Sequence, residues 1–297
     1  MTPISGGFEN NLWLVSDAHG KHVVRAPKTL KTEVHFEKIL SITKLASSLR
    51  VAPLLKSYDK KRQELCLEYI DTMSWPTYQD NQAPYRATMK ILRIFHETPQ
   101  ATHNKPKTYA PFDFIFNLTK GFDQTRMPKQ FLEALEKIND IYEELRPWLE
   151  KNAVLYHGDF HKGNVLLEKT TGHPFLIDFD CVAYGHPYFD ITKFTLTLAQ
   201  EERLELFKSY LGKKPSKEQL RHFRLVDLVT IVVIAVNRYH WGEKEGKLSK
   251  TEMEAICEAK DNPSFLKVTF ADPSPDARLK GSIYAIQEFF SRLESSF

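Results

Sequence analysis

The hydrophobic pattern of the sequence changes near residues 70–80, and this change limits the folds open to the chain. Before it, short β-rich runs flank one stretch of helical spacing. After it, helical spacing dominates, and short strands are expected only after Asn164 and at 175–180. We therefore expect an α+β fold with two lobes, a small β-rich N-terminal lobe at 1–75 and a larger, mainly helical C-terminal lobe at 76–297.

The N-terminal lobe is expected to hold two strand pairs and one helix. Residues 11–17 and 21–27 predict a hairpin across the turn Asp-Ala-His-Gly, and residues 52–59 and 64–71 predict a second pair. Between the pairs, residues 31–49 carry apolar side chains at mostly helical spacing, which predicts a helix with one buried face.

The composition excludes several classes of protein. The net charge of +3 is small for 297 residues, and the Lys and Arg side chains do not gather into a basic stripe, so we expect no nucleic-acid partner. Cys66, Cys181 and Cys257 form no C-x-x-C pair, which argues against a disulfide framework or a zinc ribbon. The longest apolar run, 225–236, is too short for a bilayer and contains Asp227, so a cytoplasmic protein without a membrane partner is expected.

The segment "YHGDFHKGNVLL" at 156–167 gathers four polar groups just before a hydrophobic strand: His157, Asp159, His161 and Asn164. Two chemistries use such groups, a metal-assisted hydrolase and a kinase that binds magnesium and a hydroxyl acceptor. The hydrolase needs further ligands at metal-binding spacing, and neither H-E-x-x-H nor a second histidine cluster is present. The pattern therefore favours the kinase.

A second acidic segment supports that choice. "FLIDFD" follows the turn "KTTGHP", so it should pair with the strand after Asn164 and bring Asp178 close to that amide. Amide and carboxylate oxygens suit Mg²⁺ that is also bound by phosphate. Asp159 would face the same place and accept a proton from an attacking hydroxyl. Asp180 is interpreted either as a second metal contact or as an exposed acid at the strand end.

Phosphate contacts are expected from the N-terminal lobe. In "SGGFENN", which includes Asn10, the pair Gly6 and Gly7 allows a tight turn whose backbone N–H groups approach phosphate oxygens closely. Arg25 ends a strand and could reach the same phosphates, held by Glu33 or Glu37 of the following helix. Glu9 argues against phosphate binding here, because it puts a carboxylate in the region where phosphate is expected.

These segments together resemble the aminoglycoside phosphotransferase and choline kinase family, which has a protein-kinase-like fold. The resemblance runs from "SGGFENN" through "HVVRAP" and "LEYID" to "HGDFHKGNVLL" and "LIDFDCVAYGHPYFDI". It implies an ATP- and Mg²⁺-dependent small-molecule kinase, a phosphotransferase with an alcohol group as acceptor. The absence of D-F-G, A-P-E and a long activation segment disfavours a protein kinase.

The resemblance also implies roles for individual residues. Asp159 corresponds to the catalytic aspartate, Asn164 and Asp178 to the magnesium ligands, and Arg25 to the cation on the ATP phosphates. Glu33 corresponds to the helix glutamate that pairs with this cation. The hinge that meets adenine through its backbone corresponds to three consecutive residues, Glu68, Tyr69 and Ile70.

The acceptor is expected to be choline or ethanolamine, because "ISGGFEN" and "VVRAP" resemble that branch of the family, although "HGD" with Gly158 resembles the antibiotic kinases. Tyr239 and Trp241 are interpreted either as core residues or as aromatic faces that hold a cationic amine. An aminoglycoside, thiamine or a sugar is the alternative acceptor. A non-catalytic, pseudokinase-like nucleotide-binding protein is the alternative of another class.

Three further residues have simpler interpretations. His157 is expected to be structural, fixing the loop that aims Asp159. Lys162 is expected either to be solvated or to touch a phosphate. Asp190 precedes a helical run, which predicts an N-cap.

Overall fold

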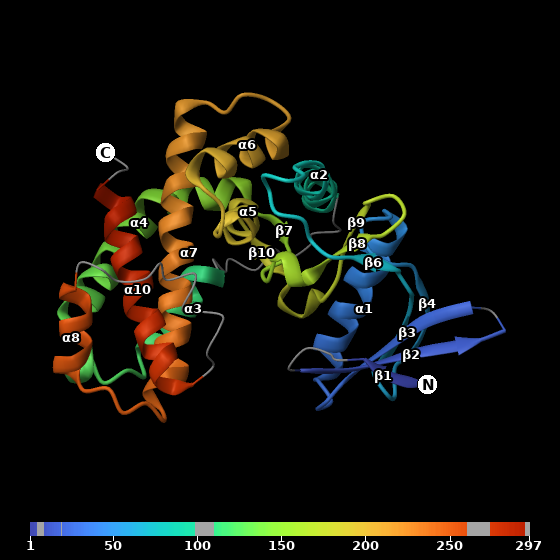
Figure 1. The fold of residues 1–297 in the computed structure, drawn as a ribbon, viewed down its shortest axis with the longest axis horizontal. Helices are drawn as coiled ribbons and strands as arrows, with labels where there is room; N and C mark the ends of the chain where they lie inside the picture. Colours follow the sequence, from blue (N-terminus) through green and yellow to red (C-terminus); the bar gives the residue numbers. More distant parts are fainter. Residues whose placement is uncertain (5–8, 19, 99–109, 260–273, 295–297) are drawn as a thin grey trace. The chain divides into compact units, whose positions relative to one another are not determined.

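The computed structural model describes residues 1–4, 9–18, 20–98, 110–259 and 274–294 of the 297-residue chain. These residues form two compact units, coloured along the sequence in Figure 1. Unit 1 contains residues 1–101, 155–183 and 198–214, and unit 2 contains the remaining segments, 102–154, 184–197 and 215–297. The fold is the expected α+β, protein-kinase-like one. The lobe boundary at residues 75–76 stays a prediction.

A five-stranded antiparallel sheet forms the first part of unit 1, in the order β1-β2-β3-β5-β4. The strands are β1 (Thr2–Ile4), β2 (Asn10–Asp17), β3 (Gly20–Pro27), β4 (Leu55–Asp59) and β5 (Glu64–Glu68). Leu12 of β2 is opposite Arg25 of β3, and Arg25 is opposite Leu65 of β5. Both predicted strand pairs are therefore confirmed, and Arg25 lies on a central strand of the sheet.

Helix α1 (Glu33–Ser48) packs on this sheet, as the apolar spacing predicts. Its N-cap is Thr32, whose hydroxyl accepts a hydrogen bond from the backbone N–H of His35. Its buried face supplies Phe36, Ile39 and Leu40, which form a core with Leu65. Burial of this face fixes the rotation of α1, so the other faces of the helix point to solvent.

The rest of unit 1 contains a second sheet and two helices (Figure 1). The sheet has the order β6-β8-β9, made of β6 (Thr72–Met73), β8 (Val165–Glu168) and β9 (Pro174–Leu176). Two 3-10 turns flank it, η2 (Lys162–Asn164) and η3 (Phe179–Cys181). Helices α2 (Ala83–Glu97) and α6 (Gln200–Leu211) complete the unit.

Unit 2 is helical. Its elements are α3 (Ala110–Thr119), η1 (Gln124–Arg126), α4 (Lys129–Asn152), α5 (Tyr188–Thr195), α7 (Lys217–Glu243), α8 (Lys250–Glu258) and α10 (Pro275–Glu294). The short strands β7 (Val154–Tyr156) and β10 (Ala183–Gly185) lie where the chain passes between units in sequence. Within the described ranges, no helix combines the length and apolar character that a bilayer crossing requires.

Candidate active site

The hairpin of β8 and β9 brings Asn164 and Asp178 together, as the sequence predicts. Val165 is opposite Leu176, and the backbone N–H of Ile177 donates to the carbonyl of Asn164 at 3.0 Å. Asp178 does not end the strand, however. It lies two residues beyond β9 with a φ of 66°, a left-handed conformation that turns the chain sharply into η3.

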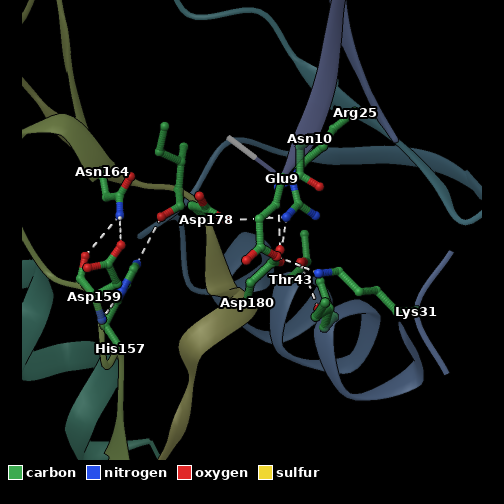
Figure 2. A network of polar contacts seen from close by, with 12 residues as sticks. Glu9, Asn10, Arg25, Lys31, Thr43, His157, Asp159, Asn164, Asp178 and Asp180 are labelled. Atoms are coloured by element: carbon green, nitrogen blue, oxygen red, sulfur yellow. Dashed lines mark hydrogen bonds and ion pairs between the residues drawn. The ribbon is translucent and has the colours of Figure 1, made fainter. Parts of the chain in front are cut away.

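Asn164 is locked onto Asp159 by its amide nitrogen (Figure 2). The Nδ2 group donates to the backbone carbonyl of Asp159 at 2.9 Å and to its Oδ2 at 3.1 Å. Because the NH₂ group is committed to Asp159, the amide oxygen is turned away from that carboxylate. This orientation suits an oxygen ligand for a cation beside Asp159.

His157 has the structural role that the sequence predicts. Its side chain is fully buried, and its Nε2 lies 2.9 Å from the carbonyl of Ile177. Its Nδ1 accepts a hydrogen bond from the backbone N–H of Asp159 at 3.4 Å, so the proton belongs on Nε2, which donates to Ile177. The histidine thus ties the Asp159 loop to the strand end that precedes Asp178.

His161 contacts Asp159, which the sequence analysis did not predict. Its Nδ1 accepts from the backbone N–H of Gly163 at 3.1 Å, and its Nε2 lies 3.5 Å from Oδ2 of Asp159. Asn164 and His161 therefore approach the same carboxylate oxygen, which fixes the plane of the Asp159 carboxylate. The spacing Asp-x-His could have raised this possibility, because the two side chains share one short loop.

Arg25 bridges the two acids of the "IDFD" segment. Its Nη2 lies 3.2 Å from Oδ1 of Asp178 and also pairs closely with Oδ1 of Asp180. Burial raises the pKa of Asp178 above its ordinary value, while the guanidinium of Arg25 acts in the opposite direction. Arg25 therefore supplies positive charge at the place where two carboxylates converge.

The prediction that Glu33 or Glu37 of helix α1 pairs with Arg25 is wrong. Arg25 pairs with the two aspartates instead, and Glu37 pairs with Lys60 at 2.6 Å. The reason is the rotation of α1, whose buried apolar face leaves Glu33 exposed in the first turn. A different residue connects α1 to the site, because the ammonium of Lys38 donates to the carbonyl of Val182 at 2.7 Å.

Three residues of the predicted phosphate segment are described, Glu9, Asn10 and Asn11, and Asn10 lies beside Asp180. The Nδ2 group of Asn10 donates to Oδ2 of Asp180 at 3.4 Å, while the buried Oδ1 of Asn10 makes no hydrogen bond. Glu9 pairs closely with Lys31, so its carboxylate is neutralised by a neighbouring cation. Gly6 and Gly7 lie outside the described residues.

Comparison with known proteins identifies the family of the chain. Residues 1–223 match the sequence profile of the phosphotransferase enzyme family, so the match covers 223 of the 297 residues. The chain belongs to the phosphotransferase enzyme family. It is a phosphotransferase, as the sequence resemblance implied. No curated protein sequence matches it.

Solved structures share the fold of this phosphotransferase at low sequence identity. A choline/ethanolamine kinase family protein from Mesorhizobium loti is 14% identical, with a TM-score of 0.67; the match covers 94% of this chain and 90% of that one. The choline kinase LicA from Streptococcus pneumoniae is 13% identical, with a TM-score of 0.61 and coverage of 97% and 95%. The gentamicin complex of APH(2")-IIa is 16% identical, with a TM-score of 0.59 and coverage of 82% and 85%.

The predicted hinge of the phosphotransferase follows strand β5. The carboxylate of Glu68 accepts from the backbone N–H of Leu54 at 3.2 Å, and the ring of Tyr69 lies beneath the ammonium of Lys21, 5.4 Å from it. Ile70 is buried. Adenine contact by Glu68, Tyr69 and Ile70 stays a prediction.

The two aromatic residues predicted for the acceptor have different surroundings in unit 2. Tyr239 is 2% exposed and packs between Phe122 and Phe131, with ring centroids 5.1 Å away in both cases, which supports the core interpretation. Trp241 is 52% exposed, and its Nε1 donates to Asn237 at 3.2 Å. Contact of either residue with an acceptor stays a prediction.

The predicted N-cap role of Asp190 is wrong. Pro187 occupies the cap position of α5, and Asp190 lies buried within the first turn. The helix begins before Asp190, because Tyr188 and Phe189 already lie in its first turn. In the first turn, the carboxylate still lies near the positive end of the helix dipole.

The oxygen donors that lie near one another in this site are of the kind that suits magnesium better than a transition metal. Within the described part of the chain, no three histidine, cysteine or acidic side chains form a metal-binding group. The donors gathered here are the amide oxygen of Asn164 and the carboxylates of Asp178 and Asp180. Such a set suits a hard cation that is also bound by phosphate oxygens and water.

Proposed function

We propose that this phosphotransferase uses ATP and Mg²⁺ to phosphorylate the hydroxyl of a small cationic alcohol, with choline or ethanolamine as the first choice. The observation that carries the proposal is the orientation of Asn164, whose amide nitrogen holds Asp159 while its oxygen points elsewhere. One short loop thus supplies a carboxylate for the acceptor hydroxyl and an oxygen ligand for magnesium.

Each charged side chain has a task in this reaction. Asp159 accepts a hydrogen bond from the acceptor hydroxyl, aims its oxygen at the γ-phosphorus, and takes the proton as the new P–O bond forms and the bond to ADP breaks. Asn164, Asp178 and Asp180 would hold magnesium. Bound there, the ion would neutralise the phosphate oxygens and the charge that develops on ADP.

Arg25 supports nucleotide use because its guanidinium lies beside the same acids. It is 12% exposed and stands on a central strand, so its position is well constrained. Solved relatives also favour this cosubstrate: LicA has been solved with AMP, and APH(2")-IIa with ATP and streptomycin. The neutralised carboxylate of Glu9 removes one objection to phosphate binding.

The choice of acceptor follows solved structures that cover more of the chain than the antibiotic kinase does. The choline/ethanolamine kinase family protein from Mesorhizobium loti and LicA cover 94% and 97% of it, whereas APH(2")-IIa covers 82%. The glycine of "HGD" does not favour an antibiotic substrate, because Gly158 has a local backbone reason in this chain: its φ is 80°.

The test is ATP consumption against choline, ethanolamine, kanamycin, thiamine and several sugars, with Mg²⁺ present. Asp159→Asn is the inactive variant, and Asp140→Asn, on the exposed surface of α4, is the matched control. Turnover with one acceptor, retained in the control and lost in Asp159→Asn, supports the proposal. If ATP with Mg²⁺ raises the melting temperature but no acceptor turns over, the pseudokinase alternative is favoured instead.

A further inference from the structure

Two aromatic side chains outside the catalytic motif, Trp75 and Tyr85, contact the loop between Asp159 and Asn164. The ammonium of Lys162 donates to the hydroxyl of Tyr85 at 2.8 Å and lies 4.7 Å from the centroid of its ring. The same ammonium lies 5.9 Å from the ring of Trp75. Both rings are within the range at which a cation is attracted to an aromatic face.

Trp75 also holds the far side of Asn164. Its indole Nε1 donates to the carbonyl of Val165 at 3.1 Å. Trp75 therefore contacts the chain two residues before Asn164, through Lys162, and one residue after it. Because Asn164 lies between these two attachments, both restrain its backbone.

The two aromatic side chains, Trp75 and Tyr85, are themselves held in place. Tyr85 is fully buried at the start of α2, and its hydroxyl donates to the carbonyl of Pro76 at 2.9 Å. Its ring makes edge-on contacts with Trp75 and Tyr78, with centroids 5.1 Å apart in both cases. The strand just before Trp75 is paired with β8, where Met73 is opposite Leu167. The ammonium of Lys162 thus binds aromatic side chains that packing and hydrogen bonds hold in place.

We propose that Lys162 is a positioning residue for phosphoryl transfer, because its anchor on Trp75 and Tyr85 holds the loop in which Asn164 bonds to Asp159. This inference rests on the proposed function. The rival is that Lys162 binds a phosphate of the nucleotide. The two roles of Lys162 predict different effects of changing Tyr85, since only the anchor gives the Tyr85 hydroxyl a part in the reaction.

The anchor is tested first without any substrate. Hydrogen exchange of residues 163–165 reports on the turn, because their N–H groups bond to His161 and Lys162. Lys162→Met and Tyr85→Phe should each speed this exchange about tenfold, the effect of losing one charge-assisted hydrogen bond. The double variant should exchange no faster than Lys162→Met alone, because that change already removes the contact with the Tyr85 hydroxyl.

Lys44→Met is the matched control. Its ammonium lies 4.2 Å from the centroid of the Tyr58 ring, so the same substitution breaks a cation–π contact elsewhere in unit 1. Exchange at residues 163–165 should not change in this variant. If exchange is unchanged in both Lys162→Met and Tyr85→Phe, the contact of Lys162 with Tyr85 does not hold the loop, whether or not the protein transfers phosphate.

Kinetics then test the role in the reaction. Lys162→Met and Tyr85→Phe should lower kcat about tenfold with little change in the KM for ATP, and Lys162→Arg should recover most of the loss. A raised KM for ATP in Lys162→Met, with a normal Tyr85→Phe enzyme, would overturn the proposal in favour of phosphate binding. If the two variants exchange faster but the wild-type protein phosphorylates no acceptor, the proposed function and this role in it are overturned, but the anchor is not.

Discussion

Gly158 and Cys181 meet backbone to backbone. A β-carbon on Gly158 would overlap the carbonyl oxygen of Cys181 and would lie 3.0 Å from its carbonyl carbon. Gly158 also has a φ of 80°, which side chains other than that of glycine rarely adopt. This contact joins the loop that carries Asp159 to the turn that carries Asp178, so two separate parts of the site share one support.

Gly158→Ala should disturb both parts of the site at once. The β-carbon would push the Cys181 turn away, and we expect a loss of about 3 kcal/mol in the free energy of unfolding together with a large fall in kcat. Gly172→Ala is the matched control, because Gly172 has a φ of 70° with nothing within 4 Å of its β-carbon position. It should cost only about 1 kcal/mol. Equal losses in chemical denaturation of the two variants would contradict a special contact at Gly158.

The sequence predicted this region well because its signals are local. Asn164 and Asp178 are linked by a short hairpin whose turn and strands are legible in "NVLLEKTTGHPFLIDFD". His157 was assigned a structural role from its place next to the Asp159 loop, and its bond to Ile177 confirms it. Where strand pairing fixes the distance between two residues, the sequence pattern alone is enough to predict that they lie close together.

The sequence failed where a contact depends on how a helix is rotated or on distant side chains. Glu33 was expected to pair with Arg25, but burial of Phe36 rotates α1 so that Glu33 faces solvent. The grip of Tyr85 on Lys162 joins residues 77 positions apart, and no spacing rule connects them. Such contacts follow from packing, which a linear pattern does not record.

Arg25→Met should make the stability of the protein depend on magnesium. Without the guanidinium, Asp178 and Asp180 would repel each other, and we expect a loss of about 2 kcal/mol in the free energy of unfolding. Mg²⁺ should then raise the melting temperature more than it does in the wild type, since it would replace the lost charge.

Arg221→Met is the control for this experiment. Arg221 pairs with Glu144 at 2.7 Å on the exposed surface, so its loss should cost little stability and add no magnesium dependence. A Mg²⁺-induced shift in Arg25→Met no larger than that of the wild type would contradict a cation site at these aspartates.

Lys31→Met should weaken nucleotide binding through Glu9. The hydrogen bond that the Lys31 ammonium donates to Glu9 raises the pKa of Lys31 above its ordinary value, so Lys31 is charged at neutral pH. Removing Lys31 exposes a carboxylate near the expected phosphates, and the Kd for ATP should rise several-fold at low salt. Glu9→Gln combined with Lys31→Met should restore most of the affinity in titration calorimetry. If the double variant binds as weakly as Lys31→Met, repulsion by Glu9 is not the cause.

His222 should make unit 2 sensitive to acid. Burial lowers its pKa below the ordinary value of 6.5, while Glu218 and Glu144 oppose the shift. A base whose folded pKa is lowered binds fewer protons when folded, so its stabilisation is complete above pH 6.5 and is lost as the pH falls below it. Its ring centroid lies 4.2 Å from that of Trp148, and a charged ring would need water there.

His222→Gln should therefore reduce the fall in melting temperature between pH 7.5 and pH 5.5. His35→Gln on α1 provides the control, because His35 lies half-buried at the other unit's helix start. A wild-type fall in melting temperature that His222→Gln leaves unchanged would show that other groups cause the acid sensitivity.

The most direct test of the account is the rate of phosphoryl transfer by Asp159→Asn, measured with the acceptor found by the substrate panel, at saturating ATP and Mg²⁺. Asparagine keeps the size of the side chain but cannot accept the proton of the hydroxyl, so kcat should fall about a hundredfold to ten-thousandfold. Hydrogen exchange at residues 163–165 should remain close to that of the wild type. A kcat within a few-fold of the wild type would contradict Asp159 as the group that receives the acceptor proton.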